Sequence, residues 1–482
     1  DQTGADQTGA DQTGADQTGA DQTGADQTGA RPNILLVMAD DQGWGDMAYN
    51  GHESLVTPNF DQAAAEGLRL DRFYAAAPVC SPTRASVMTG RTPNRMGVFK
   101  WGYPMRPQET TIAEVLKSAG YATGHFGKWH LGSVRRESPA NPGRNGFDRW
   151  LSAANFYDND PVMSDEGTAV QMTGESSIIA ADAALEWMEE VSRGDQPFFG
   201  VVWFGSPHAP HRAAAEDRAH YQDQPKPARE FLGEVTGMDR AFGKLRDGLG
   251  ELGVRENTIL WYCSDNGALP KVGSTGGYRG QKGKVYEGGL LVPAIIEWPA
   301  RIKSPRQSEM RATTCDIFPT LVELVGVEVQ KPRPLDGISL AALIDQQKEG
   351  RTRPIGFWDY TIGGISTPSD QWMKELLKAQ ADGGDLPPHP SSQKAAELPS
   401  PPLSSTTFPG HSAWIEGDWK LHRIEDKKGK VTIELYDLAN DRVEEDNQAV
   451  GQVKRATRMQ SELEEWLVSV VGSLNGEDYE SR

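Results

Sequence analysis

A series of apolar runs, each followed by polar residues, constrains the fold of this chain more than any other feature. Residues 34–39, 198–204 and 258–263 are almost continuously apolar, as expected for strands buried on both faces of a parallel sheet. Amphipathic helical patterns over residues 176–193 and 231–252 lie between these runs. Because strands alternate with helices along the chain, the sequence predicts the α/β class, with one large, mostly parallel, doubly wound sheet.

Segments of different composition divide the chain of 482 residues. Residues 1–30 are six identical copies of Asp-Gln-Thr-Gly-Ala, which cannot form a packed core and indicate an artificial tag or a placeholder. The large α/β domain is expected at residues 31–330. Residues 331–482 predict a smaller α+β subdomain with an antiparallel sheet. Within it, residues 363–410 are rich in proline, serine and glycine and predict a long irregular insertion.

The composition argues against two classes of function. The formal net charge is −19 and no basic run is present, so nucleic acid is not an expected partner. The longest apolar runs fall far short of the roughly 20 residues that span a bilayer, so no membrane span is expected. Three cysteines do not make a disulfide framework. Cys263 and Cys315 lie in strand-like and helix-like segments and are expected to be small buried hydrophobic residues.

Cys80 opens the sequence Cys-Ser-Pro-Thr-Arg. Pro82 fits the first position of a helix and Ser81 fits its cap, which predicts that Cys80 lies at the N-terminus of a short helix. There its side chain would face unpaired N–H groups, with the guanidinium of Arg84 one turn away, and this environment favours an anion. Cys80 is then a nucleophile of low pKa, a residue that is converted after synthesis, or a buried structural thiol.

Oxygen-bearing side chains follow two of the predicted strands. Asp40 and Asp41 come directly after the first apolar run, and Asp265 and Asn266 follow residues 258–263. A single Asp or Asn in such a place is usually a turn former. Two adjacent carboxylates repel each other, however, and the carboxyl ends of strands are where open α/β sheets bind ligands. The sequence therefore predicts a site for a hard divalent cation.

Lysine and histidine residues follow two further strands. Lys128 and His130 come after the strand-like residues 121–126 and, being two apart on an extended segment, point the same way. His208 and His211 follow the second apolar run. A lone lysine is usually a surface residue and a lone histidine a satisfied core residue. The prediction that these groups bind an anion and transfer protons therefore depends on their shared position at strand ends.

The segment at residues 80–84 has the form Cys-x-Pro-x-Arg, and residues 127–132 read Gly-Lys-Trp-His-Leu-Gly. Together they resemble the formylglycine-dependent sulfatases of the alkaline phosphatase superfamily, and the resemblance extends through most of residues 31–330. It implies that a maturation enzyme oxidises Cys80 to formylglycine (3-oxoalanine). It also implies a calcium ion held by Asp40, Asp41, Asp265, Asn266 and the modified Cys80.

The resemblance further implies a role for each basic residue. His208 matches the family's His-x-Pro pattern, and Lys282 matches the lysine before Gly-x-x-Tyr-Glu-Gly-Gly. Lys128 and Lys282 would neutralise the sulfate, and Arg84 would hold the hydrated aldehyde. His208 would protonate the departing alcohol oxygen, and His130 would remove the proton that releases sulfate.

The implied function is release of sulfate from a sulfated carbohydrate by a bacterial polysaccharide sulfatase that is periplasmic or secreted. Aromatic and polar residues outside the motifs could contact the sugar: Trp101, His211, Arg212, Trp358 and His411. Two alternatives stay open. A phosphonate or phosphate diester hydrolase of the same superfamily could use this site, and a chain with unmodified Cys80 could bind a sulfated glycan without catalysis. The second alternative is disfavoured because a binding protein needs neither His130 nor His208.

Overall fold

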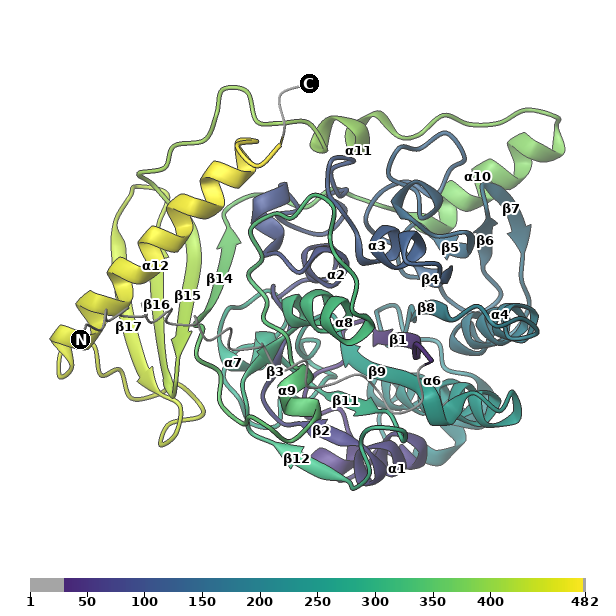
Figure 1. The fold of residues 1–482 in the computed structure, drawn as a ribbon, viewed down its shortest axis with the longest axis horizontal. Coiled ribbons are helices and arrows are strands. Elements are labelled where there is room, and N and C mark those ends of the chain that lie inside the picture. The colour runs from purple at the N-terminus through teal and green to yellow at the C-terminus, as the bar shows by residue number, and fades with distance from the viewer. Residues whose placement is uncertain (1–29, 480–482) are drawn as a thin grey trace, which may run out of the picture. The chain divides into compact units, whose positions relative to one another are not determined.

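The computed structural model describes residues 30–479, and its largest sheet contains the apolar runs of the sequence. Its strands are β1 (Asn33–Ala39), β2 (Leu68–Leu70), β4 (Ala122–Lys128), β5 (Arg149–Ala153), β6 (Val162–Asp165), β7 (Thr168–Gln171), β8 (Phe198–Trp203), β9 (Thr258–Ser264), β11 (Ala294–Glu297) and β12 (Arg306–Ser308). They lie in the order β12-β2-β11-β9-β1-β8-β4-β5-β6-β7 (Figure 1). The five strands from β9 to β5 are parallel neighbours. Apart from Ala30, the repeat at residues 1–30 lies outside the described residues.

Alternate side chains of β1 enter two different cores, so the sheet needs a helical layer on each face. The layers consist of α1 (Pro58–Glu66), α2 (Cys80–Thr89), α3 (Ile112–Ser118), α4 (Ser176–Val191), α6 (Lys226–Glu251) and α8 (Ile317–Val325). Ile34, Leu36 and Met38 pack in the core that contains α2, α3 and α8. Leu35 and Val37 pack in the core that contains α1, α4 and α6. The predicted mostly parallel, doubly wound sheet is therefore confirmed.

The C-terminal part contains a separate antiparallel sheet, as the sequence predicted. Its order is β14 (Ile355–Tyr360), β15 (Gly410–Glu416), β16 (Trp419–Glu425) and β17 (Val431–Asp437). The long helix α12 (Val453–Leu474) crosses this sheet, on the left of Figure 1. Leu463 and Leu467 of α12 share a core with Leu421 and Leu435 of the sheet, so the helix buries one face of these strands. On the other face, Ala413 shares a core with Tyr74 and Leu290.

Residues 363–410 are not irregular throughout, and that prediction was wrong. They contain α10 (Ser369–Ala381) and α11 (Pro390–Ala395). Met373 and Leu376 of α10 are buried in the main core, and the side-chain oxygen of Gln380 accepts a hydrogen bond from the backbone of Ala169 in β7 at 2.8 Å. Apolar residues at helical spacing thus bury one face of α10 against the sheet edge. The proline and glycine around it obscured this pattern in the sequence.

Several short elements complete the described residues. β3 (Phe73–Tyr74), β10 (Leu291–Val292) and β13 (Ala312–Thr313) form a small sheet, and the short helices are α5 (Ala215–Arg218), α7 (Glu287–Leu290) and α9 (Ala341–Ile344). Cys263 and Cys315 are buried and free, as expected of small apolar residues. No helix between residues 30 and 479 combines the length and the apolar character that crossing a membrane requires.

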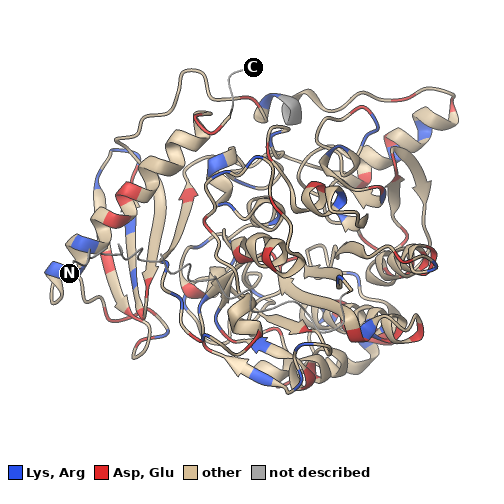
Figure 2. Cartoon of the chain, viewed as in Figure 1, with Lys and Arg blue, Asp and Glu red and all other residues tan. Residues whose placement is uncertain are grey.

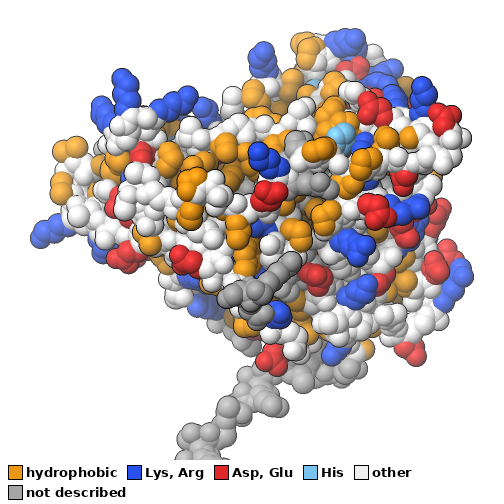
Figure 3. Space-filling view, turned by 90° about the horizontal axis from the view of Figure 1, so that it is seen from above, with side chains coloured by type: hydrophobic (Ala, Val, Ile, Leu, Met, Phe, Trp, Pro, Cys, Tyr) orange, Lys and Arg blue, Asp and Glu red, His pale blue; other side chains and the backbone are white. Residues whose placement is uncertain are grey.

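Charge alone does not single out a binding surface. Blue basic and red acidic residues are scattered over the chain (Figure 2). On the face shown in Figure 3, basic and acidic side chains are mixed with hydrophobic ones. The strand ends, where the predicted site residues lie, are therefore the better guide to a functional site.

Candidate active site

The carboxyl ends of the parallel strands bring the predicted oxygen ligands together. Ala39 of β1 pairs with Ser264 of β9, so Asp40 and Asp265 leave the sheet side by side. The backbone N–H of Asp41 donates to Asp265 Oδ1 at 3.0 Å. These contacts join segments more than 220 residues apart, as expected where parallel strands end at the same edge of a sheet.

Cys80 lies at the N-terminus of α2, but the helix begins differently from the prediction. It starts at Cys80 itself after Val79, which makes no side-chain cap. Ser81 is not the cap, because its hydroxyl accepts a hydrogen bond from Gly102 N at 2.9 Å. Pro82 is tolerated as the third residue, since a helix makes no internal bonds to the N–H groups of its first turn.

The environment of Cys80 narrows the three interpretations of this residue. Burial raises the pKa of its thiol, although Lys128 and Lys282 act in the opposite direction. A nucleophile of low pKa is therefore not supported. Cys80 is only 2% exposed, yet it lines a cavity next to the strand ends. A thiol that serves only to fill the core has no need of such a cavity.

Each carboxylate of the site is paired with its own cation. Lys128 Nζ donates to Asp40 Oδ2 at 2.7 Å, and Lys282 Nζ donates to Asp41 Oδ2 at 2.6 Å. Arg84 donates to Asp265 Oδ2 from Nη2 at 2.6 Å and from Nε at 3.0 Å. The array alternates acids and bases and is nearly all buried. A buried array of this kind is stable only while every charge keeps its partner.

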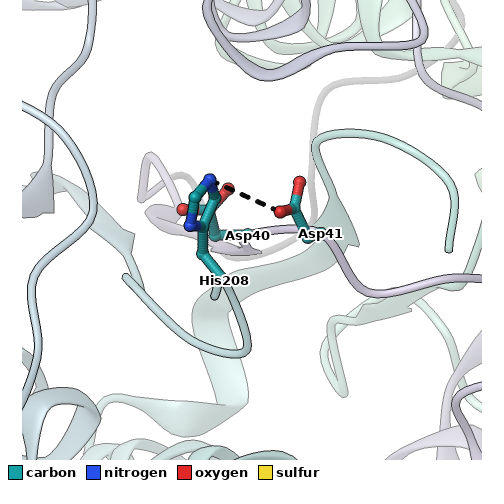
Figure 4. Close-up of side chains that lie close together, drawn as sticks. All are labelled: Asp40, Asp41 and His208. Carbon is teal, nitrogen blue, oxygen red and sulfur yellow. Dashed lines mark ion pairs between the residues drawn. The ribbon is translucent and has the colours of Figure 1, made fainter. Parts of the chain in front are cut away.

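Two buried oxygens of the site have no hydrogen-bond partner among residues 30–479, namely Asp40 Oδ1 and Asn266 Oδ1. Ligand atoms of Asp40, Asp41 and His208 lie within 4.8 Å of one another (Figure 4). Burial raises the pKa of Asp40 although Lys128 opposes the shift. Buried oxygen acceptors without partners suit a hard divalent cation, so the residues present fit the predicted calcium ion.

His130 is held in the site by a strained backbone. Its φ of 53° lies in the left-handed region, as does that of Asp41 at 70°. Such conformations cost about 1–3 kcal/mol each and concentrate at functional sites. Neither ring nitrogen of His130 has a hydrogen-bond partner in the described part of the chain. Burial, followed by the charge of Lys128, lowers the pKa of His130 well below its usual value, so the neutral ring can accept a proton.

We expect Gly127→Ala to disable the site, because Gly127 sets the path of the chain into Lys128 and His130. Its φ is +106°, and a Cβ there would lie 2.0 Å from the Trp203 carbonyl oxygen of the neighbouring strand. Relieving this clash must shift the end of β4. The expected result is a fall in turnover of more than about a hundredfold, because misplacement by about 1 Å has such an effect.

Gly120→Ala is the matched control for this substitution. Gly120 has a similar φ of +90° but nothing within 4 Å of the added Cβ. It should show only the cost of a left-handed alanine, roughly 1–2 kcal/mol in a thermal melt, with normal turnover. Equal activity of the two variants would show that the position of the β4 end does not matter.

A cavity of about 550 Å³ lies next to Cys80 and the strand ends. It is lined by Cys80, Trp101, His130, Asn155, Phe156, His208, Lys282, Gly364, Ser366, Thr367 and Pro368. Trp101 is the one sequence-based sugar candidate on this wall, and it is 44% exposed. The backbone of Ile365 donates to the Trp101 carbonyl oxygen at 2.9 Å, so the insertion closes one side of the cavity.

The other sugar candidates do not line this cavity. His211 lies 3.2 Å from Glu234 and packs on Phe231. Arg212 lines a neighbouring groove. His411 Nε2 lies 2.8 Å from His422 Nδ1 in the C-terminal sheet, and Trp358 is buried in the core of that sheet. The structure therefore does not bring these four residues to Cys80.

Sequence reasoning missed several residues of the cavity wall. Asn155 and Phe156 follow β5 in a segment whose elements the sequence did not reveal, and residues 364–368 belong to the insertion. None of them is part of a motif with its own chemistry. Only their contact with His208 and Trp101, which is a tertiary feature, identifies them.

Comparison with known proteins adds an independent finding. Residues 32–327, more than half of the chain, match the family described as Sulfatase. Over 352 residues the chain is 34% identical to N-acetylgalactosamine-6-sulfatase of Canis lupus familiaris, covering 64% of this chain and 65% of that protein. It is also 34% identical over 352 residues to arylsulfatase A of Homo sapiens, covering 65% and 68%. The chain thus spans about two thirds of the length of these relatives, and slightly less for the canine protein.

A solved structure shows the same fold over nearly the whole chain. The crystal structure of Ps i-CgsB in complex with k-i-k-neocarrahexaose superposes with a TM-score of 0.75 at 23% sequence identity. The match covers 91% of this chain and 93% of that chain. It therefore includes the C-terminal sheet, which lies outside the range of the family match.

Proposed function

Since the chain belongs to the sulfatase family, we propose that it hydrolyses sulfate esters of carbohydrates, using a formylglycine formed from Cys80 and a calcium ion. The observation that most supports this function is the convergence of Cys80, His130, His208 and Lys282 on one cavity wall. The buried ion pairs of Asp40 with Lys128 and of Asp265 with Arg84 belong to the same site. A sulfate placed there would meet ammonium groups, a proton donor and a proton acceptor together.

The calcium ion would be held by Asp40, Asp41, Asp265 and Asn266, together with an oxygen of the modified Cys80. When bound, the ion would supply positive charge that stabilises the equatorial oxygens of a sulfate. Cys80 begins α2 beside these residues, and Arg84 lies one turn further on with its guanidinium on Asp265. Arg84 is therefore placed to orient the group that replaces the thiol. When formed, the hydrated aldehyde would provide a nucleophilic hydroxyl and a second hydroxyl whose proton a base can remove.

The surrounding side chains would neutralise charge and transfer protons. Lys128 and Lys282 donate N–H groups and neutralise sulfate charge. His208 Nε2 holds the proton that passes to the departing alcohol oxygen. His130, a neutral ring with unpartnered nitrogens, accepts the proton that is lost in the release step. Acid and base are thus separate residues that line the same cavity as Cys80.

The proposed substrate is a sulfated sugar, and the proposed partner is a formylglycine-generating maturation enzyme. Two relatives are named N-acetylgalactosamine-6-sulfatase and arylsulfatase A, and the similar solved structure is a complex with k-i-k-neocarrahexaose. The exposed indole of Trp101 at the cavity mouth offers a sugar an apolar face. We place the protein in the periplasm or outside the cell, as is typical of the family.

The experiment that tests this function combines mass spectrometry of the peptide containing Cys80 with turnover of an aryl sulfate by the same preparation. We expect a loss of about 18 Da from the cysteine peptide, which is not a step of the sulfenic-to-sulfonic oxidation series, together with sulfate release. A converted residue that hydrolyses an aryl phosphodiester faster than the sulfate would favour the diester hydrolase. An unconverted thiol after co-expression with a maturation enzyme would favour the glycan-binding protein.

A further inference from the structure

We propose that Phe156 is a positioning residue for His208, whose imidazole it holds in the orientation from which Nε2 faces the departing oxygen. The inference rests on the proposed function, since it concerns the acid of that reaction. Phe156 has no proton to give or take. Its effect on the reaction must therefore pass through the ring that it contacts.

The two rings form a close parallel stack. Their centroids are 4.2 Å apart and their planes are inclined by only 11°. Both residues line the cavity of Cys80. The face of the phenyl ring therefore fixes the plane of the imidazole.

A second contact fixes which nitrogen of His208 can react. Nδ1 lies 2.5 Å from the Ala209 carbonyl oxygen, which can only accept, so Nδ1 carries a proton and donates it. Nε2 is left to face the site, 3.6 Å from Asp41 Oδ2 (Figure 4). With this hydrogen bond alone, the imidazole of His208 could still rotate about the line from Nδ1 to the carbonyl oxygen. The stacked phenyl ring removes this remaining freedom.

The segment that carries Phe156 is itself anchored on both sides. Asn155 Nδ2 donates to the Thr367 carbonyl oxygen at 3.1 Å, which ties the segment to the insertion. Tyr157 is buried and packs against Gly205, where a Cβ would come within 3.0 Å of its ring. His208 retains 20% exposure of its side chain, so it depends on this segment more than a core residue would. A fixed Phe156 between two anchors can hold a partly exposed histidine.

The test is the dependence of rate on leaving-group acidity in a series of aryl sulfates, measured on preparations whose Cys80 peptide shows conversion. Aryl sulfates of weakly acidic phenols need a proton on the departing oxygen, whereas 4-nitrophenyl sulfate scarcely does. For Phe156→Ala we expect kcat to fall about tenfold with phenyl sulfate and less than about twofold with 4-nitrophenyl sulfate. The tenfold loss is a fraction of the 10²–10⁴ that general acid catalysis provides. Phe156→Tyr keeps the ring face and should restore the wild-type profile.

A double-mutant cycle separates positioning from a general structural role. His208→Ala should steepen the dependence on leaving-group acidity more strongly, and adding Phe156→Ala should steepen it no further. Phe156→Leu serves as a second variant if the alanine protein does not fold. An equal loss with every aryl sulfate, or a change in KM alone, would overturn the proposal. If converted wild-type protein hydrolyses no sulfate at all, the proposed function itself fails, and this outcome is distinct from an active enzyme with an unchanged profile.

Discussion

Asp40→Asn is expected to reduce kcat/KM by more than about a hundredfold and to remove the stabilisation of the protein by calcium. Asp40 Oδ1 is one of the two buried site oxygens without a partner, so it is free to bind the cation. An asparagine can still accept the hydrogen bond from Lys128, which should preserve the fold. It cannot supply the negative charge that a hard cation needs. A ligand present at about 100 times its Kd stabilises a protein by about 2.7 kcal/mol, and this increment should vanish.

The measurement is a pair of thermal melts with calcium and with a chelator, alongside turnover. Asp46→Asn is the control, because Asp46 is also buried but both its oxygens accept backbone hydrogen bonds, from Gly43 at 2.8 Å and Ser274 at 2.7 Å. It should keep its response to calcium. Because burial raises the pKa of Asp40, protons compete for this carboxylate, and wild-type calcium affinity should fall as the pH falls. An unchanged calcium response in Asp40→Asn would exclude this carboxylate as a ligand.

The strand ends of the site could be predicted from the sequence because hydrophobicity and topology act together there. The run at residues 34–39 is apolar on both faces, as is typical of a central parallel strand, and adjacent parallel strands end at a common edge. Asp40 and Asp265 were therefore expected at the same edge, and the pairing of Ala39 with Ser264 makes them neighbours. Long-range proximity followed from a local pattern.

The walls of the cavity could not be predicted in this way. Residues 364–368 approach the site through the insertion, whose helix α10 packs in the main core, and Phe156 is recognised only by its stack on His208; no local signal encodes either contact. The same limit applies to His411. Its sequence context suggested a sugar contact, whereas the structure pairs it with Ile424 and so places its ring diagonally next to that of His422. Register within a sheet decides the neighbours of such a residue, and register is set by the whole sheet.

Lys420→Met is expected to destabilise the protein by about 3–5 kcal/mol, the cost of breaking a buried ion pair by removing one partner. Lys420 of β16 is fully buried, and its Nζ donates to Glu287 Oε1 at 2.8 Å and lies 3.1 Å from Glu444 Oε1. Glu287 begins α7, five residues after Lys282. The methionine would leave two buried carboxylates without a counter-ion where the C-terminal sheet meets the loop of the site. A thermal or urea melt measures the loss, and turnover should fall with it as the Lys282 loop loosens.

Lys374→Met provides the matched comparison, because Lys374 also donates to a carboxylate, that of Asp370, at 2.8 Å. That pair is mostly exposed, at 62% and 69%, and water replaces the lost partner, so we expect a change of no more than about 0.5 kcal/mol. Adding Glu287→Gln to Lys420→Met should recover part of the stability, since it removes one of the uncompensated charges. An equal loss in the free energy of unfolding for the two lysine substitutions would show that burial does not strengthen the ion pair of Lys420. Recovery of stability in the double variant would show that charge pairing, as well as apolar contact, attaches the C-terminal sheet to the loop that carries Lys282.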